Sequence, residues 1–152
     1  FISVMPANLY GPGDKYTKEN SHVVAALLRR FHEAKGEKAD QVEIWGTGKA
    51  MREFIHCDDM ADACFYLMEN YESPNLVNIG TGKDISIKDL AYLIKDIVNY
   101  DGELIFDTTK PDGMPRKVVD TKKLNDLGWV SSIDLREGLK HTYNSYIDLA
   151  ST

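Results

Sequence analysis

The chain has 152 residues and a formal net charge of −6, a length that suffices for one hydrophobic core. Lys and Arg occur in runs of at most two, which excludes the clustered basic face of a nucleic-acid-binding protein. No apolar run is long enough to cross a membrane and no stretch has the order of a signal peptide, so we expect a cytoplasmic protein without a membrane partner. The two cysteines, Cys57 and Cys64, lack zinc-site spacing and are expected to be reduced.

The first residues predict a strand followed by a loop. Residues 1–5 are rich in β-branched and aromatic side chains, which predicts a buried strand that Pro6 ends. Turn-forming residues follow between Asn8 and Asp14, at the carboxyl end of the strand, where open α/β sheets bind ligands. Because the chain begins at Phe1 within this strand, we interpret it as a piece of a longer protein.

Residues 22–31 predict an amphipathic helix with Asn20 or Ser21 as its N-cap. Helical spacing places apolar side chains on one arc and polar ones on the arc beside it. The apolar arc holds Val23, Val24, Leu27, Leu28 and Phe31, and the polar arc holds His22, Ala26, Arg30 and Glu33. In one interpretation His22 is an ordinary first-turn residue, and Arg29 and Arg30 form a solvated last turn. In the other, the helix lines a cleft in which His22 handles a proton and Arg30 binds an anion.

Two strands, Gln41–Trp45 and Met51–His56, are separated by a Gly-Thr-Gly segment that predicts a tight hairpin. This segment has neither the spacing of a dinucleotide fingerprint nor that of a P-loop. Trp45 and Arg52 could face one site, the first offering an aromatic face and the second a fork for phosphate.

The sequence His56-Cys57-Asp58-Asp59 permits either a metal site or a helix N-cap. A helix follows at once, and the sequence shows no further His/Asp/Glu cluster to complete a coordination set. We therefore favour capping by Asp58 or Asp59 and predict no metal.

The remaining elements alternate between strands and helices. They are a strand at 76–79 with a turn at 80–82, an amphipathic helix capped by Ser86, a strand at 104–106, a loop at 110–117, a short helix at 122–127 capped by Asp120, and a final packing helix at 135–149.

Several short motifs occur together along the chain. They are PANLYGP at 6–12, REFIH at 52–56 with Asp58 and Asp59, NIGTG at 78–82, and Arg116-Lys117 with Asp120 and LGW at 127–129. This combination resembles the C-terminal half of the extended short-chain dehydrogenases that act on nucleotide sugars. Further motifs are similar, nearly end to end, to the GDP-L-fucose synthase family: SVMP at 3–6, NSHV at 20–23, LLRRFH at 27–32, VEIWG at 42–46 and KPDG at 110–113.

The resemblance implies an α/β fold, the C-terminal substrate-binding portion of an extended Rossmann-type short-chain dehydrogenase. Edge strands of a Rossmann sheet would lie in about 1–11 and 75–82 of a single unit spanning 1–152, and the NADP-binding half would be absent. The implied reaction converts GDP-4-keto-6-deoxy-D-mannose into GDP-L-fucose, by epimerisation at C3 and C5 followed by NADPH-dependent reduction of the C4 ketone. A homodimer is implied for the complete enzyme.

The resemblance also implies a role for individual residues. His22 would be the acid that returns a proton to the sugar carbon, and it would lie beside the nicotinamide. Pro6, Ala7, Asn8 and Leu9 would form the loop that contacts NADP(H). The GDP-sugar pocket would be lined by Val23, Leu27, Arg30, Trp45, Arg52, Asp112 and Lys117.

Elementary chemistry agrees with these roles. Epimerisation beside a ketone needs a group that returns a proton, and an imidazole, with an unperturbed pKa of about 6.5, suits that task. A helix N-terminus disfavours an imidazolium, so either a nearby group offsets the dipole or His22 acts as a neutral donor. Arg30, Arg52 and Lys117 can neutralise a diphosphate, and Asp112 can accept a hydrogen bond from ribose or guanine.

Other parts of the implied machinery are missing from the sequence. It contains no glycine-rich dinucleotide fingerprint and no Tyr-x-x-x-Lys pair. In the family these parts, together with the catalytic serine and the cysteine base, lie in the N-terminal half. We therefore expect the 152-residue chain alone to be inactive. Two alternatives stay open: another nucleotide-sugar epimerase or dehydratase, and a non-catalytic domain that binds a sugar nucleotide.

Overall fold

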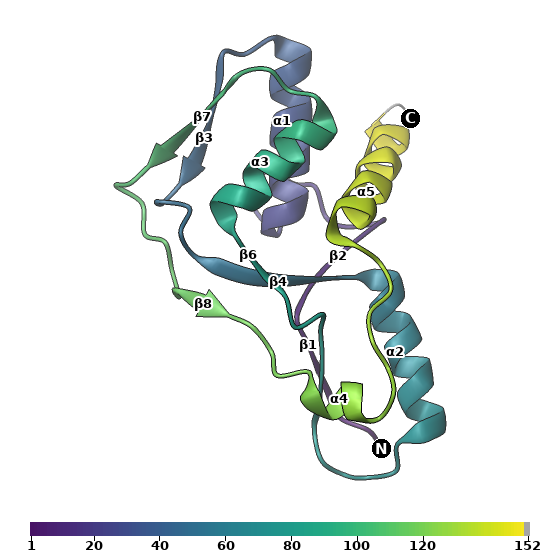
Figure 1. Cartoon of the computed structure of the whole chain (residues 1–152). Coiled ribbons are helices and arrows are strands. Elements are labelled where there is room, and N and C mark those ends of the chain that lie inside the picture. The colour runs from purple at the N-terminus through teal and green to yellow at the C-terminus, as the bar shows by residue number, and fades with distance from the viewer. Residues whose placement is uncertain (151–152) are drawn as a thin grey trace.

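The structure is a computed structural model that describes residues 1–150; the expected unit ran to residue 152, and its last two residues lie outside this range. Helices and strands alternate along the chain (Figure 1). In order they are β1 (Val4–Pro6), β2 (Asn8–Tyr10), α1 (Val23–Glu37), β3 (Gln41–Trp45), β4 (Met51–His56), α2 (Cys57–Asn70), β5 (Val77–Ile79), β6 (Asp84–Ser86), α3 (Ile87–Val98), β7 (Glu103–Asp107), β8 (Arg116–Lys117), α4 (Lys122–Asp126) and α5 (Leu135–Ala150). No helix within residues 1–150 has both the length and the apolar character that crossing a membrane requires.

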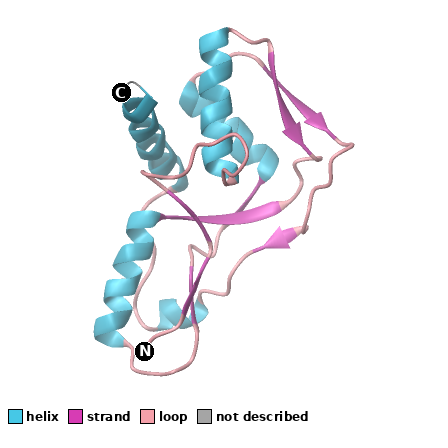
Figure 2. Ribbon diagram, turned by 180° about the vertical axis from the view of Figure 1, so that it is seen from behind, coloured by secondary structure: helices cyan, strands magenta, loops and turns pink. Residues whose placement is uncertain are grey.

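The strands within residues 1–150 form three small sheets in which parallel pairs predominate. β1 pairs with β5 and β3 pairs with β7, each in parallel. β4 organises the third sheet, because it pairs in parallel with β2 and β8 and antiparallel with β6. Seen from behind, β4 crosses the molecule between the helices α1 and α3 above it and α2 and α4 below it (Figure 2). The parallel pairs joined through helices confirm the predicted α/β class.

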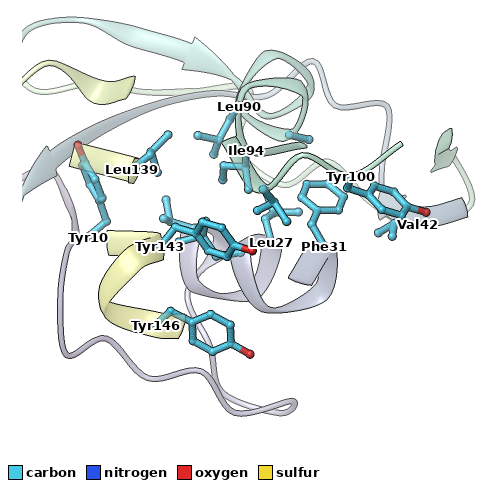
Figure 3. Packing of buried hydrophobic residues seen from close by; sticks show 14 of the residues in the cluster. Tyr10, Leu27, Phe31, Val42, Leu90, Ile94, Tyr100, Leu139, Tyr143 and Tyr146 are labelled. Atoms are coloured by element: carbon cyan, nitrogen blue, oxygen red, sulfur yellow. The ribbon is translucent and has the colours of Figure 1, made fainter. Parts of the chain in front are cut away.

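The upper core lies between α1, α3 and α5 (Figure 3). Leu27 and Phe31 of α1 pack with Leu90 and Ile94 of α3, and Leu139 of α5 belongs to the same cluster. The predicted apolar arc of α1 is confirmed, with Val23 at its partly buried edge. The amphipathic patterns of α1 and α3 thus correctly predict the face that each one buries, and α5 packs against the same core as expected.

A second core joins α2, β5 and α4. Ala63 and Leu67 of α2, Val77 and Ile79 of β5 and Leu124 of α4 are all buried in it. The two clusters lie on either side of β4, whose Phe54 belongs to the upper cluster and whose Ile55 belongs to the lower one. Alternation along this strand therefore connects both cores.

The predicted hairpin is wrong, because β3 and β4 do not pair with each other. Gly46 and Gly48 adopt positive φ values of 82° and 73°, which glycine tolerates and which turn the chain away from β3. The Gly46 N–H donates to the carbonyl of Asp107 at 2.9 Å, so the segment after β3 stays with β7. Glycines signal a turn but do not determine which strands pair across it.

Three predicted helix caps need correction. His22, and not Asn20 or Ser21, is the N-cap residue of α1. His56, and not Asp58 or Asp59, caps α2, because β4 stays extended through His56 and its Nδ1 accepts the Asp58 N–H at 3.2 Å. Likewise Thr121, and not Asp120, is the N-cap residue of α4, although an oxygen of Asp120 accepts the Lys122 N–H at 2.9 Å.

The Ser86 cap of α3 is confirmed, since its hydroxyl accepts the Asp89 N–H at 2.9 Å. The predicted solvated last turn at Arg29 and Arg30 is wrong. α1 continues to Glu37, and Arg29 is buried and forms an ion pair of 2.7 Å with Glu33. The apolar arc continues past the arginines through Phe31 and Ala34, which explains the longer helix.

The N-terminal strand is displaced from its predicted position. β1 covers Val4–Pro6, so Pro6 lies inside the strand, and Met5 is exposed rather than buried. The predicted loop begins only at Gly11, because Asn8–Tyr10 forms β2 in register with residues 54–56 of β4. A proline is tolerated here because β1 has a partner, β5, on one side only within the described residues.

Candidate functional site

A cavity of about 460 Å³ lies between the chain that follows β1 and the first turn of α1. Its wall is formed by residues 7–14, His22, Val23, Val24, Phe54 and Cys57. Five of the residues predicted for the site from the sequence meet there: Ala7, Asn8, Leu9, His22 and Val23.

Hydrogen bonds to β5 and β4 fix residues 7–9, which form one side of this cavity. The Ala7 N–H donates to the carbonyl of Ile79 at 2.8 Å, which continues the β1–β5 ladder. The Asn8 side-chain amide donates to the Glu53 carbonyl at 2.7 Å, which ties β2 to β4. Leu9, whose exposed fraction is 42%, is left with its apolar side chain at the cavity wall.

His22 contributes the imidazole of the site. Its backbone is extended, with ψ of 162°, and its carbonyl accepts the Ala26 N–H at 2.8 Å. Its side chain makes no capping hydrogen bond, although the residue occupies the N-cap position. The exposed imidazole is therefore available to a molecule in the cavity.

Of the predicted residues that do not line this cavity, three come from β1 and α1. Pro6 lies in β1, and Leu27 is buried in the upper core. The Arg30 guanidinium donates to the carbonyl of Glu43 on β3, and burial lowers the pKa of Arg30. The polar arc of α1 thus starts at the cavity with His22 and reaches β3 two turns later.

The other predicted substrate residues gather around the segment that follows β3. Trp45 is 66% exposed, and the Lys110 ammonium lies 5.6 Å from the centre of its ring. One oxygen of Asp112 accepts the Thr47 N–H and the other accepts the Thr47 hydroxyl, both at 2.6 Å. The hydroxyl hydrogen bond lowers the pKa of Asp112. Asp112 therefore holds the 110–117 loop against the turn next to Trp45.

Two cations adjoin this loop. Arg52 and Lys117 are direct partners in the β4–β8 ladder, and residues directly opposite in a ladder project from the same face. A Cβ built on Gly113 would lie 3.7 Å from an Arg52 guanidinium nitrogen, so the Asp112-Gly113 turn adjoins Arg52. The structure thus brings Trp45, Arg52, Asp112 and Lys117 together; none of the four lines the cavity that contains His22.

The fold also brings a third residue to the rejected metal motif. Ligand atoms of His56, Asp58 and His141 lie within 4.8 Å of one another, and the two imidazole rings stack at 5.6 Å between centroids. The sequence could not reveal His141, which comes from α5. Burial lowers the pKa of His56, and its Nδ1 already serves as the α2 cap. Capping accounts for the position of His56 beside Asp58. Nothing in the described residues tests the prediction of no metal, which stays a prediction.

Cys57 and Gly11 belong to the cavity wall and were missed from the sequence. Burial raises the pKa of the Cys57 thiol. A side chain on Gly11 would meet this sulfur at 2.3 Å, so only glycine allows the 11–13 loop to pack here. The Gly-Pro-Gly sequence was the available signal: it predicted a loop at the ligand-binding end of the strand, but it did not single out Gly11 as a site residue.

A family model described as the NAD dependent epimerase/dehydratase family matches residues 1–80, and the chain belongs to this family. Among curated relatives, GDP-L-fucose synthase 1 of Arabidopsis thaliana is 53% identical over 146 residues, which are 96% of this chain and 45% of that protein.

Solved structures extend the similarity to the whole fold. A GDP-L-fucose synthetase from Naegleria fowleri bound to NADP matches with a TM-score of 0.94 and 29% identity, over 100% of this chain and 48% of that one. MlghC, a GDP-mannoheptose C4 reductase from Campylobacter jejuni with NADP bound, matches with a TM-score of 0.83 and 37% identity, over 97% of this chain and 53% of that one. These matches confirm the predicted Rossmann-type fold class; the chain spans about half the length of these relatives.

Proposed function

We propose that the complete gene product is a GDP-L-fucose synthase, which epimerises C3 and C5 of GDP-4-keto-6-deoxy-D-mannose and reduces C4 with NADPH. This chain supplies the GDP-sugar pocket and the epimerisation acid, and it is inactive alone. The observation that carries the proposal is the position of His22, whose imidazole is exposed at a cavity wall and is not used in capping. The relatives named as GDP-L-fucose synthases support the choice of reaction.

The cavity residues fit the nicotinamide end of NADP(H). The apolar side chain of Leu9 and the chain at residues 7–9 form one part of the cavity wall, and the polar imidazole of His22 forms another. Pro6, Ala7, Asn8, Leu9 and His22 would hold this part of the cofactor. NADPH supplies the hydride for the C4 ketone when it is bound.

His22 returns a proton to the sugar carbon during epimerisation. Because the residue is exposed, water can return a proton between turnovers. A general acid of this kind contributes about 10²- to 10⁴-fold to a rate.

The substrate's nucleotide lies at the second group of residues. Arg52 and Lys117, side by side on β4 and β8, neutralise the diphosphate. Trp45 offers its exposed ring to the base, and Asp112 accepts a hydrogen bond from the ribose or guanine with lone pairs that Thr47 leaves available. Val23 and Arg30 continue the pocket along α1, and Leu27, whose side chain is buried in the upper core, would contribute by packing beneath it. The strands β1 and β5, within about 1–11 and 75–82, belong to the edge of the Rossmann sheet.

We also propose that the complete protein is a cytoplasmic homodimer that binds neither nucleic acid nor membrane. The net charge of −6 supports the exclusion of nucleic acid. A second candidate function is C4 reduction of a different GDP-sugar. The similarity to the Campylobacter GDP-mannoheptose C4 reductase, at 37% identity, favours this alternative over a non-catalytic domain.

The test is NADPH oxidation by the complete gene product given GDP-4-keto-6-deoxy-D-mannose, with solvent deuterium incorporation at C3 and C5 measured in parallel. His22→Asn should lower deuterium incorporation at least about 100-fold. His141→Asn, an exposed histidine on α5, is the matched control and should retain the wild-type rate.

Retention of deuterium exchange by His22→Asn would reduce His22 to a structural residue. If the wild-type protein reduces the C4 ketone without incorporating deuterium at C3 and C5, the second candidate function, C4 reduction of a different GDP-sugar, would be favoured. Robust turnover by the 152-residue chain alone would contradict its proposed inactivity.

A further inference from the structure

Glu53 is a buried carboxylate that the proposed reaction does not use. Its exposed fraction is 1%, and within residues 1–150 it forms no ion pair with a lysine or arginine. It lies on β4 next to Arg52, and side chains alternate along a strand, so the two residues project from opposite faces. A buried charge without a cation must be satisfied by hydrogen bonds.

The two carboxylate oxygens hold two segments that are distant in the sequence. Oε1 accepts the N–H groups of Thr81 and Gly82 at 2.6 and 2.7 Å. Oε2 accepts the N–H of Val119 at 2.8 Å. Glu53 thereby joins the turn after β5 to the chain that leaves β8.

Gly80 makes room for this arrangement. A Cβ at Gly80 would lie 2.3 Å from Oε1 of Glu53 and 2.6 Å from a methyl group of Val119. The glycine that the sequence presents as part of a turn is therefore required because the carboxylate approaches it closely.

The hydrogen bond from the Val119 N–H to Glu53 lies two residues beyond Lys117, which pairs with Arg52 in the β4–β8 ladder. The β4–β8 ladder consists of Met51 with Arg116 and Arg52 with Lys117, and it ends there. The next hydrogen bond between the two segments is the one from Val119 to the Glu53 side chain. This side chain therefore extends a two-residue strand pair that would otherwise be short and weakly held.

We propose that Glu53 is a positioning residue for the GDP-sugar. Through Val119, its carboxylate fixes Lys117 beside Arg52, where both cations can bind the diphosphate. The other carboxylate oxygen fixes the turn after β5. The inference rests on the proposed function, because it takes the diphosphate to be the ligand of these cations. Glu53 itself contacts neither substrate nor cofactor.

A carboxylate is required because both of its oxygens accept hydrogen bonds: three come from backbone N–H groups, and a longer one of 3.4 Å comes from the Thr81 hydroxyl. A glutamine has one acceptor oxygen, and its NH₂ group would face an N–H on one side. Glu53→Gln therefore keeps the size of the side chain and breaks the contact with either Val119 or the 81–82 turn. Removing an acceptor in this way leaves a buried donor unsatisfied.

The experiment measures the affinities of the complete gene product for GDP and for NADP by calorimetry. Glu53→Gln should weaken GDP binding about tenfold and leave NADP binding unchanged. Gly80→Ala, which keeps the carboxylate but displaces it, should act in the same direction. The matched control is Glu103→Gln, an exposed glutamate on β7, which should bind both ligands like the wild type.

A double variant separates positioning from general loosening of the fold. If Glu53 acts through Lys117, Glu53→Gln should weaken GDP binding no further in a protein that already carries Lys117→Ala. Additive losses, equal losses of GDP and NADP affinity, or unchanged GDP affinity in a folded Glu53→Gln protein would each overturn the inference. So would failure of both Glu53→Gln and Gly80→Ala to fold, since the carboxylate would then serve the fold as a whole. A wild-type protein that binds no GDP would instead refute the proposed function.

Discussion

Replacing Asp59 by asparagine tests how α5 is attached to the rest of the molecule. Asp59 lies in the first turn of α2 with an exposed fraction of 3%. One of its oxygens accepts the N–H and the hydroxyl of Ser132, at 3.1 and 2.9 Å, and the other accepts the Ile133 N–H at 3.0 Å. These bonds fix the segment that leads into α5, whose Leu139 completes the upper core.

The magnitude follows from the number of acceptors that remain. Asparagine keeps one oxygen for Ser132 and presents an NH₂ group to the Ile133 N–H, which then loses its partner. An unsatisfied buried donor costs about 1–3 kcal/mol, and the remaining bonds lose the contribution of the charge. We expect Asp59→Asn to lower the free energy of unfolding by about 2–3 kcal/mol.

Urea denaturation of the 152-residue chain, followed by tryptophan fluorescence, measures this change. Of its two tryptophans, Trp129 is buried and donates from Nε1 to Asp62 at 2.7 Å, whereas Trp45 is already exposed. The signal therefore reports mainly on the region beside Asp59. The control is Asp58→Asn, whose side chain is 66% exposed, and it should cost less than about 1 kcal/mol. Equal losses for the two variants would refute the role given to the Asp59 hydrogen bonds.

Two further predictions concern tyrosines. Alanine normally stabilises the interior of a helix relative to glycine. A Cβ at Gly138, however, would lie 2.2 Å from the Tyr10 hydroxyl, so Gly138→Ala should lower the free energy of unfolding by about 1–3 kcal/mol. A higher melting temperature of the variant would contradict this. Burial raises the pKa of Tyr16 from 10.0 to about 12. Because the folded state then holds the proton more tightly, the stabilisation is present below pH 10 and is lost as the pH rises through 12. Tyr16→Phe should therefore shift alkaline unfolding, followed by circular dichroism, to higher pH, and an unchanged midpoint would count against this.

Local patterns were sufficient for the helices. The apolar spacing in α1 and α3 correctly predicted the buried face of each one, because helical periodicity depends only on the nearby sequence. Ser86 was also predicted correctly as a cap, since its acceptor and the Asp89 N–H are three residues apart. The caps at His22 and His56 were missed because each of these residues still has an extended backbone, His56 as the last residue of β4, so that each helix begins one residue later.

By itself, the sequence determined the α/β class, the apolar faces and the motifs that indicate a nucleotide-sugar enzyme. The tertiary structure decided which strands pair: β3 lies beside β7, and not beside β4 as the glycines between them suggested. It also decided how the site is assembled, since Arg52 meets Lys117 through a strand pair, and Glu53 reaches Val119 across 66 residues of sequence. Such contacts depend on how complete elements pack and on which distant N–H groups a buried carboxylate can reach, and no local pattern contains that information.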